Sequence, residues 1–218
     1  APTTGFLSGL SRDMAARLGL SPETPFILGG QDGVLANLGI GAMDEGVYAV
    51  TIGTSSAVRT AVRKPLLDPE GRLFCYALTP DDWIVGGPSN NGAVAVKWMA
   101  ERLFPGRALE EVLPLAEQVP AGANGLLFAP FLSGERAPHW DPRARGVLLG
   151  LTLAHREGDM IRAAMEGVVF QVAAIAEQIR QACRPIREVR ASGGFARSRL
   201  WCQMLADVLD TPVHVPPS

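Results

Sequence analysis

One carboxylate, Asp32, stands between small residues in the stretch GGQDGVLANLG (29–39), directly after the apolar run PFIL (25–28). A lone acid where a strand ends and a helix begins has two interpretations. It caps the helix, because Asp is a favoured N-cap residue. Alternatively it acts as a general base, because a carboxylate accepts the proton of a hydroxyl group within its reach. The two are compatible, since one oxygen can cap while the other faces a substrate.

Three further stretches place small, hydroxyl-bearing or amide residues at the ends of predicted strands: TIGTSS (51–56), GGPSNNG (86–92) and ASGGFARS (191–198). The first can aim N–H groups and hydroxyls at phosphate oxygens. The second can hold a phosphate or ribose at a helix N-terminus, and the glycines of the third allow close approach to a flat ligand. Each stretch by itself also has a structural interpretation: a hairpin turn capped by Ser and Thr, a loop with Asn caps, and a tight turn that needs glycine. Their repetition favours a ligand, because open α/β sheets bind ligands outside the strand ends.

Phosphoryl transfer to an alcohol is the chemistry that fits this set. It needs positioning of the phosphates, a metal ion, and one acceptor for the hydroxyl proton. Asp32 beside a phosphate-binding rim supplies that acceptor. The motifs of several other enzyme classes are absent from the chain: the phosphate loop GxxxxGK[ST], the dinucleotide fingerprint GxGxxG, the nucleophile elbow GxSxG and the metalloprotease motif HExxH. The sequence therefore does not indicate these classes.

The elements that position these residues follow an α/β order. An apolar stripe spaced 4, 3, 4, 3, 4 predicts the longest helix, and shorter patterns predict helices over 8–19, 33–40, 91–103, 108–118 and 197–210. Strands are expected at 46–54, 57–62, 72–78, 82–87, 124–130, 188–192 and 212–215, and PFILG (25–29) is expected to be a short buried strand. The strands over 46–87 have no helix between them, which favours an antiparallel meander. The whole pattern predicts a mixed sheet flanked by helices.

The composition of the chain limits the kinds of partner and cofactor that it is expected to bind. The chain has 218 residues, 47% hydrophobic and 19% charged, with a net charge of -2, as in a soluble globular protein of one large or two small domains. It has no basic run, which argues against nucleic acid and anionic membranes as partners. Three scattered cysteines and three scattered histidines favour neither a disulfide framework nor a zinc site, and no apolar run is long enough for a bilayer. We expect a cytoplasmic protein, and the absence of an initial Met suggests a piece of a longer chain.

The motifs resemble those of the FGGY carbohydrate kinases, a branch of the actin/Hsp70-like (ribonuclease H-like) ATPase superfamily. GGQDGVLANLG, TIGTSS, GGPSNNGAVAVKW, ERAPHWDPRARGVLLGLT and SGGFARSRLWCQMLADVL occur in the family's order along nearly the whole chain. The most specific part is the second family signature, which is satisfied by Gly146, Leu148, Gly150, Leu151, Asp159, Met160, Ala163, Ala164, Met165 and Glu166. Within the family the motifs look most like gluconate kinases, with xylulose kinases second.

The resemblance implies roles for individual residues. Asp32 resembles the family's catalytic base, which also lies near Mg²⁺. The residues that match its ATP-binding positions are Gly53, Thr54, Gly92, Lys97, Gly193, Gly194 and Ser198. Arg136 has two interpretations: it pairs with the carboxylate of gluconate, or, since a similar Arg occurs in family members whose sugar has no carboxylate, it orders its loop. Trp140 and Asp141 are interpreted as residues that order the same loop, and Glu166 as a packing residue.

The resemblance also implies a division of the chain. Residues 1–24 are expected to be an interdomain segment with the first helix, and residues 25–218 the ATP-binding domain, truncated at its C-terminal end. The sugar-binding N-terminal domain is absent, so we expect this chain to be inactive alone. The implied activity is ATP-dependent phosphorylation of a sugar or sugar acid, D-gluconate foremost, with a homodimer possible. The alternatives are a xylulose kinase and an inactive, kinase-like nucleotide sensor.

Overall fold

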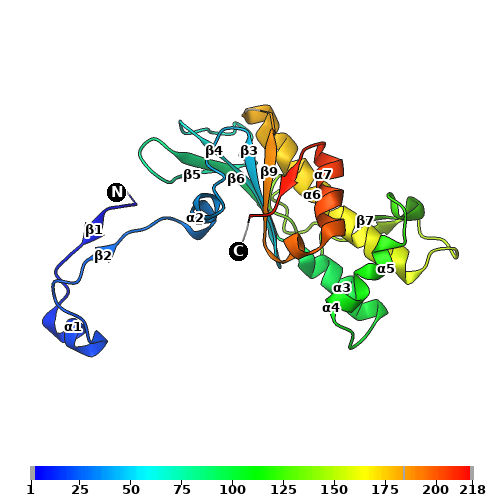
Figure 1. The fold of residues 1–218 in the computed structure, drawn as a ribbon, viewed down its shortest axis with the longest axis horizontal. Coiled ribbons are helices and arrows are strands. Elements are labelled where there is room, and N and C mark those ends of the chain that lie inside the picture. Colours follow the sequence, from blue (N-terminus) through cyan, green and yellow to red (C-terminus); the bar gives the residue numbers. More distant parts are fainter. Residues whose placement is uncertain (1–2, 184, 217–218) are drawn as a thin grey trace.

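A computed structural model describes residues 3–183 and 185–216 (Figure 1). Its centre is a six-stranded sheet in the order β10-β9-β3-β4-β6-β5. The bounds are β3 (Val47–Ile52), β4 (Ser56–Val62), β5 (Phe74–Ala77), β6 (Trp83–Ser89), β9 (Glu188–Ser192) and β10 (Val213–His214). Strands β3, β9 and β10 run parallel, whereas β3, β4, β6 and β5 pair antiparallel. The expected mixed sheet is therefore confirmed.

The four strands over residues 47–89 do not form the simple meander that their order suggested. Strand β4 pairs with β6, and β5 lies outside β6 at the edge of the sheet. The connection over residues 63–73 contains Pro65 and Pro69, so β5 starts well beyond β4. The inner position instead goes to the longer and more buried β6, while the exposed β5 lies at the edge.

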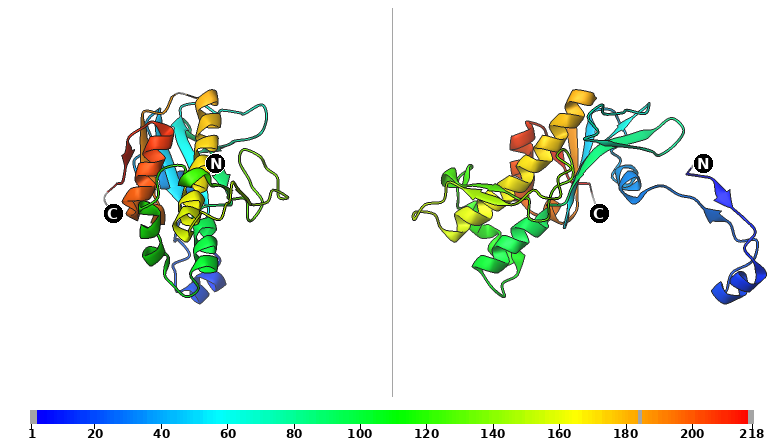
Figure 2. Two further views of the ribbon diagram at one scale, coloured as in Figure 1. Left: turned by 90° about the vertical axis from the view of Figure 1, so that its right-hand side faces the viewer. Right: turned by 180° about the vertical axis from the view of Figure 1, so that it is seen from behind.

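Helices cover one face of the sheet (Figure 2). The 26-residue α6 (Glu157–Ala182) packs on β4 and β6, and α3 (Ala93–Leu103), α7 (Arg199–Leu209) and the small hairpin of β7 (Leu127–Ala129) and β8 (Val147–Leu149) lie around it. The predicted stripe of α6 is confirmed, because these six residues are all fully buried: Ile161, Met165, Val168, Val172, Ile175 and Ile179. Burying such side chains stabilises the fold by roughly 1.5–3 kcal/mol each.

The helix predicted over 108–118 is divided in two. Helix α4 (Leu109–Val112) ends before α5 (Pro114–Glu117), which begins on its proline. Proline has no N–H group and cannot continue an existing helix, whereas it is well suited to the first position of a new one.

The opposite face of the sheet is covered only in part. Helix α2 (Asp32–Gly39) lies there and inserts Val34 among Ala61, Leu78 and Ile84. The remainder of this face, next to β4 and β5, stays open and forms part of the site described below.

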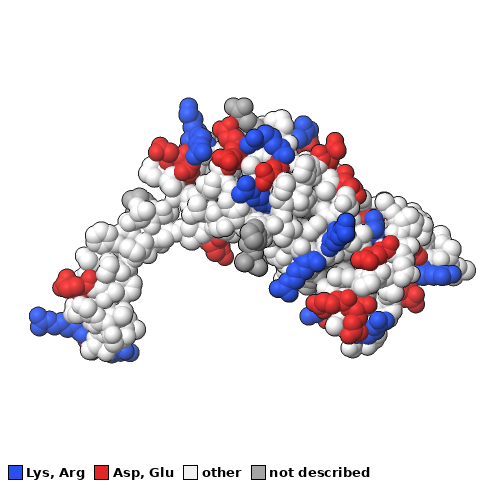
Figure 3. Space-filling model, in the orientation of Figure 1, with Lys and Arg blue, Asp and Glu red and all other residues white. Residues whose placement is uncertain are grey.

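Residues 3–30, here called the N-terminal arm, extend away from the sheet (Figures 1 and 2). Strands β1 (Phe6–Leu7) and β2 (Phe26–Ile27) pair with each other, and α1 (Arg12–Leu18) lies between them at the tip. The expectation of a buried strand at PFILG is wrong, since Ile27 is 62% exposed. Its strand belongs to a two-stranded hairpin with no layer packed over it. Figure 3 shows a mostly uncharged arm with charged side chains near α1.

No helix in the described part of the chain is long and apolar enough to cross a membrane. The three cysteines, Cys75, Cys183 and Cys202, are free thiols.

Candidate functional site

Three strand ends meet at one edge of the sheet, as the sequence predicted. The paired residues Thr51 and Ser192 bring the ends of β3 and β9 together, and Ser56 pairs with Ser89 at the end of β6. The hydroxyl oxygens of Thr51 and Ser192 lie 2.8 Å apart and share a hydrogen bond. The loops rich in small and hydroxyl residues therefore form one continuous rim.

Asp32 is the first residue of α2, and its exposed side chain lies beside this rim. The helix cap itself is Gln31, whose Oε1 accepts a hydrogen bond from Val34 N at 3.1 Å. Asp32 Oδ1 accepts from Gly33 N at 2.6 Å and from Gln31 Nε2 at 2.7 Å. Both bonds use the same oxygen, so Oδ2 is left to face solvent or a substrate. The structure thus combines a bond to the first helical turn with an available carboxylate oxygen.

Gly53 and Thr54 form a tight turn between β3 and β4, in which Gly53 N donates to Ser55 O at 2.9 Å. The turn rests on the start of α3. Gly92 N donates to Thr54 O at 3.1 Å, Ala93 N to Gly53 O at 2.7 Å, and Val94 N to Thr54 O at 3.3 Å. The first N–H groups of α3 are therefore satisfied by protein carbonyls.

These bonds change the interpretation of GGPSNNG. A phosphate held by the α3 N-terminus would need N–H groups that the turn already uses. Gly92 instead allows close packing, because a Cβ there would lie 2.6 Å from Gly53 O. The structure gives Gly92 the role of supporting the Gly53–Thr54 turn.

The loop after β9 has two glycines with different environments. Gly193 has φ +94°, and a Cβ there would lie 2.6 Å from Ile52 O, so this glycine lets the loop pack on the end of β3. A Cβ at Gly194 meets no protein atom within 4 Å. Ser198 caps α7, and its hydroxyl accepts a hydrogen bond from Trp201 N at 3.3 Å.

Lys97 lies on the exposed side of α3. Its Nζ is 3.7 Å from Glu101 Oε1, and both side chains are largely exposed. This ion pair leaves the Lys97 ammonium free to exchange partners, because exposed pairs of this kind contribute little stability.

A cavity of about 460 Å³ lies between α2 and the open face of the sheet. Of the predicted site residues, Asp32 lines it, together with Thr51 and Ser192 from the rim and two residues that sequence reasoning did not assign to a ligand, Arg59 and Tyr76. Of the predicted ATP-binding residues, Gly53, Thr54, Gly92 and Gly193 lie at the rim itself, whereas Lys97 lies on α3 and Ser198 at the start of α7. Arg59 lies inside a strand and belongs to none of the motifs, so its sequence position carries no signal of a ligand.

Glu135 is a second residue that the motifs did not reveal. Its carboxylate is buried and accepts hydrogen bonds from Ser89 Oγ (2.7 Å), Asn90 N (2.9 Å), Asn91 Nδ2 (3.0 Å) and Arg136 N (2.7 Å). These bonds join the loop over residues 131–146 to the end of β6. A buried carboxylate requires such donors, because charge without partners is costly in the interior.

The interpretation of the neighbouring loop residues as ordering groups agrees with their contacts. Arg136 NH2 donates to Ser89 O at 3.0 Å, and Asp141 O accepts from Glu135 N at 2.9 Å. Glu166 is buried in α6, where its Oε1 accepts from Arg162 Nε at 2.6 Å and Gly122 N at 3.0 Å. Glu166 is thus a packing residue, as expected.

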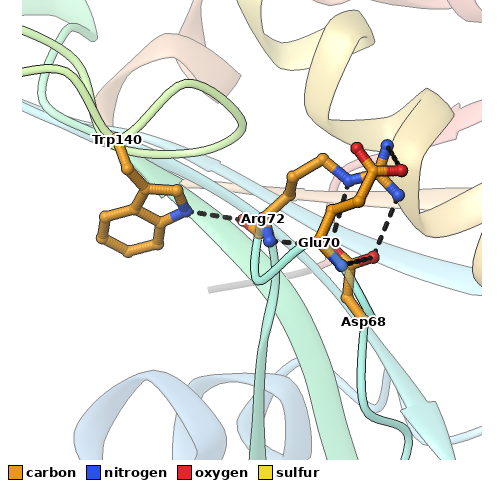
Figure 4. Close-up of polar contacts among 4 residues, drawn as sticks. All are labelled: Asp68, Glu70, Arg72 and Trp140. Carbon is orange, nitrogen blue, oxygen red and sulfur yellow. Dashed lines mark hydrogen bonds and ion pairs between the residues drawn. The ribbon is translucent and has the colours of Figure 1, made fainter.

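Trp140 ties the far side of this loop to the connection between β4 and β5 (Figure 4). Its indole Nε1 donates to Arg72 O at 2.9 Å. The Arg72 guanidinium in turn donates two hydrogen bonds to Asp68, which lower the pKa of the Asp68 carboxyl to about 2. The loop is therefore attached at two points, through Glu135 to the end of β6 and through Trp140 to the connection between β4 and β5.

Comparison with known proteins agrees with this architecture. The model for the C-terminal domain of the FGGY family of carbohydrate kinases matches residues 48–218. The gluconokinase of Bacillus subtilis (strain 168) is 43% identical to this chain, over all of the chain and 44% of that enzyme. The xylulose kinase of the same organism is 33% identical over 92% of the chain and 40% of that enzyme. The chain thus spans less than half the length of these relatives.

A solved structure extends the likeness to three dimensions. The crystal structure of gluconate kinase from Lactobacillus acidophilus superimposes with a TM-score of 0.90 at 35% identity, over 99% of this chain and 44% of that one. The mixed sheet with its flanking helices is accordingly the actin/Hsp70-like ATPase fold, as predicted. The chain belongs to the FGGY family of carbohydrate kinases.

Proposed function

We propose that this chain is the ATP-binding half of a carbohydrate kinase that transfers the γ-phosphate of ATP to a hydroxyl of a sugar acid, D-gluconate, giving 6-phosphogluconate. The observation that carries the proposal is the position of Asp32. Its carboxylate lies at the rim where the turns after β3, β6 and β9 meet, with one oxygen bonded to α2 and the other available. The likeness to gluconokinases supports the choice of substrate.

In this proposal Asp32 takes the proton of the sugar hydroxyl as that oxygen bonds to the γ-phosphorus, while the bond between the γ-phosphorus and the β,γ-bridging oxygen breaks and ADP leaves. The turn of Gly53 and Thr54 contacts phosphate, with Gly92 supporting it from α3. Gly193, Gly194 and Ser198 line the adenosine side. Lys97 approaches the nucleotide from the exposed side of α3.

The residues present fit a magnesium ion held mainly by the nucleotide. Mg²⁺ bound with nucleotides takes one or two protein carboxylates, its remaining ligands being water and phosphate oxygens. Asp32 offers one carboxylate oxygen of this kind. No group of three or more His, Cys, Asp and Glu side chains gathers among the described residues, so an all-protein cage is not the relevant type. When bound, Mg²⁺ neutralises charge on the phosphates.

The activity requires the other half of the enzyme. A phosphoryl transfer site excludes water by closing over both substrates, whereas the rim and the Asp32 cavity are open on the side away from α6. We infer that an N-terminal domain of the same parent chain supplies the remaining phosphate and sugar contacts, and that residues 1–218 alone bind nucleotide weakly without transfer.

The test is a coupled assay of ADP release with Mg·ATP on the intact parent chain, comparing D-gluconate, xylulose and glycerol. We expect turnover on gluconate and little on the other two. If the enzyme prefers xylulose, the proposed mechanism stands and xylulose replaces gluconate as the substrate. Nucleotide binding without turnover on any sugar or sugar acid would instead support an inactive nucleotide sensor. Gluconate-dependent ADP release by purified residues 1–218 would overturn the need for a second domain.

A further inference from the structure

Arg59 occupies the wall of the Asp32 cavity with most of its hydrogen-bonding capacity unused. It lies within β4, and its side chain points to the open face of the sheet, opposite α6. Its NH1 donates to Thr51 Oγ1 at 3.2 Å, the hydroxyl that also bonds to Ser192. A guanidinium carries five N–H donors in a fixed plane. Within the described chain this is its single hydrogen bond, and no carboxylate lies within ion-pair distance of it.

Two glycines make room for this side chain. A Cβ at Gly33 would lie 3.2 Å from Arg59 Nε and 3.4 Å from its NH2. A Cβ at Gly86, on the neighbouring strand, would lie 2.9 Å from Arg59 Cγ. The guanidinium therefore lies against the first turn of α2, next to Asp32. Burial lowers the pKa of the Arg59 guanidinium while the Asp32 charge opposes this shift, and an arginine stays protonated in either case.

The charges that line the cavity favour an anion. Its charged residues are Asp32, Arg59 and Arg136, two cations and one anion, although the whole chain has a net charge of -2. Arg136 is bonded to Ser89 O and helps to order its loop. Arg59 also donates a single side-chain hydrogen bond, but it lies beside Asp32 on the open face of the sheet, and a planar pair of N–H groups matches the two oxygens of a carboxylate.

The shape of the cavity separates this cation from the phosphate rim. Arg59 lies three residues beyond the start of β4, away from the Gly53–Ser55 turn. On its other side, Phe74 and Tyr76 from β5 stack with ring centroids 4.5 Å apart and bound the cavity. A polyol chain with its reacting hydroxyl at Asp32 has space along the sheet toward these rings, with Arg59 beside it.

We propose that Arg59 is the specificity residue that binds the carboxylate of the sugar acid, an inference that rests on the proposed kinase function. The negative charge of Asp32 disfavours an anionic substrate in the same cavity. Arg59 offsets that repulsion and distinguishes an acid from a neutral sugar of equal length. The hydrogen bond to Thr51 Oγ1 orients the guanidinium and uses one of its five N–H donors.

The experiment uses the intact parent chain and two substrates that differ only at the relevant group: D-gluconate and D-glucitol, in which CH₂OH replaces the carboxylate. The variants are Arg59→Gln, Arg59→Lys and the control Arg63→Gln. Arg63 follows the same strand, but its side chain is exposed and paired with Asp82. KM and kcat are measured for each substrate and for ATP, and glucitol is also measured as a competitive inhibitor against gluconate.

We expect Arg59→Gln to lower kcat/KM for gluconate about 10- to 100-fold, mostly through KM, as is typical for loss of a charge-assisted hydrogen bond. The parameters for glucitol and for ATP should stay within about twofold, Arg59→Lys should recover part of the loss, and Arg63→Gln should resemble wild type.

Three results would overturn the inference. An equal loss on both substrates, seen in kcat, would place Arg59 at the transferring phosphoryl group or in the support of the rim, with the kinase function intact. An unchanged KM for gluconate would remove Arg59 from the site. If the wild-type enzyme phosphorylates neutral sugars but not gluconate, the proposed substrate is wrong, and this inference is wrong with it.

Discussion

At the scale of single residues, two neighbours have different roles: Gln31 caps α2, and Asp32 is the proposed acceptor of the hydroxyl proton. Gln31 occupies the N-cap of α2, a place where the sequence pointed to Asp32. The displacement by one residue was not predictable, because Gln is an uncommon cap and Asp a favoured one. Its effect is to leave Asp32 Oδ2 outside the helix, beside the rim.

Asp32→Asn in the intact parent chain should therefore lower kcat about 10²- to 10⁴-fold, the usual contribution of a general base. The cap and the bond to Gly33 N survive the substitution, since an amide oxygen also accepts hydrogen bonds. We expect the thermal midpoint to stay within about 2 °C and the Kd for ATP within about threefold, measured by calorimetry. A variant that no longer folds would show that Asp32 serves the helix rather than the reaction.

Gly194 and Gly193 are a matched pair of positions for testing the proposed adenosine side. At Gly194 a new side chain meets no protein atom within 4 Å, so Gly194→Val should fold normally and raise the KM for ATP about tenfold, equivalent to about 1.4 kcal/mol. At Gly193 the positive φ and the nearby Ile52 O make valine strained, so Gly193→Val should lower the thermal midpoint instead. An unchanged KM for ATP in a folded Gly194→Val enzyme would remove Gly194 from the site.

At the scale of elements, regular patterns predicted more than local turns did. The period of the apolar residues in α6 identified the buried stripe, because packing one helix face demands that spacing. The exchange of β5 and β6 was not predictable, since two antiparallel orders suit the same strands and the choice depends on which strand is covered. Arg59 and Glu135 were likewise hidden, because their roles arise from contacts across the sheet edge.

The anchor of the 131–146 loop gives a prediction about pH. Asp68 has a folded pKa of about 2, held down by the Arg72 guanidinium, against about 3.9 in an unfolded chain. A depressed pKa stabilises the fold above the unfolded value, and this contribution disappears as pH falls from about 4 toward 2. Asp68→Asn should therefore reduce the free energy of unfolding at pH 7 by about 1 kcal/mol and change it little at pH 2. Urea titrations at both pH values measure this, and an equal difference at both would exclude the ion pair as its cause.

At the scale of the whole molecule, the N-terminal arm and the sheet are two separate structures. Apart from the chain connection, Thr3 Oγ1 donates to Leu78 O at 2.7 Å, and the hairpin strands pair only with each other. The arm exposes apolar side chains of both strands, including Phe6 at 63% and Phe26 at 43%. The predicted boundary at residue 25 falls inside this arm, and the family match begins later, at residue 48.

Deleting residues 1–28 should leave the sheet unaffected. We expect the thermal midpoint of the remaining chain to change by less than about 3 °C, because the described part of the deleted segment donates one hydrogen bond beyond the arm, to Leu78 O next to β5. Self-association should decrease, since a contiguous apolar surface is removed. Calorimetry and sedimentation measure the two effects, and a large fall in the midpoint would show that the arm supports the sheet.

The path from the arm to α2 is short. Gly29 and Gly30, the last residues of the arm, lead through Gln31 to α2, which begins at Asp32 and is held to the sheet by Val34 among Ala61, Leu78 and Ile84. The exposed apolar hairpin is thus joined by only a few residues to the helix that bears the proposed catalytic carboxylate, so one short stretch of chain links a surface suited to a binding partner with the candidate site.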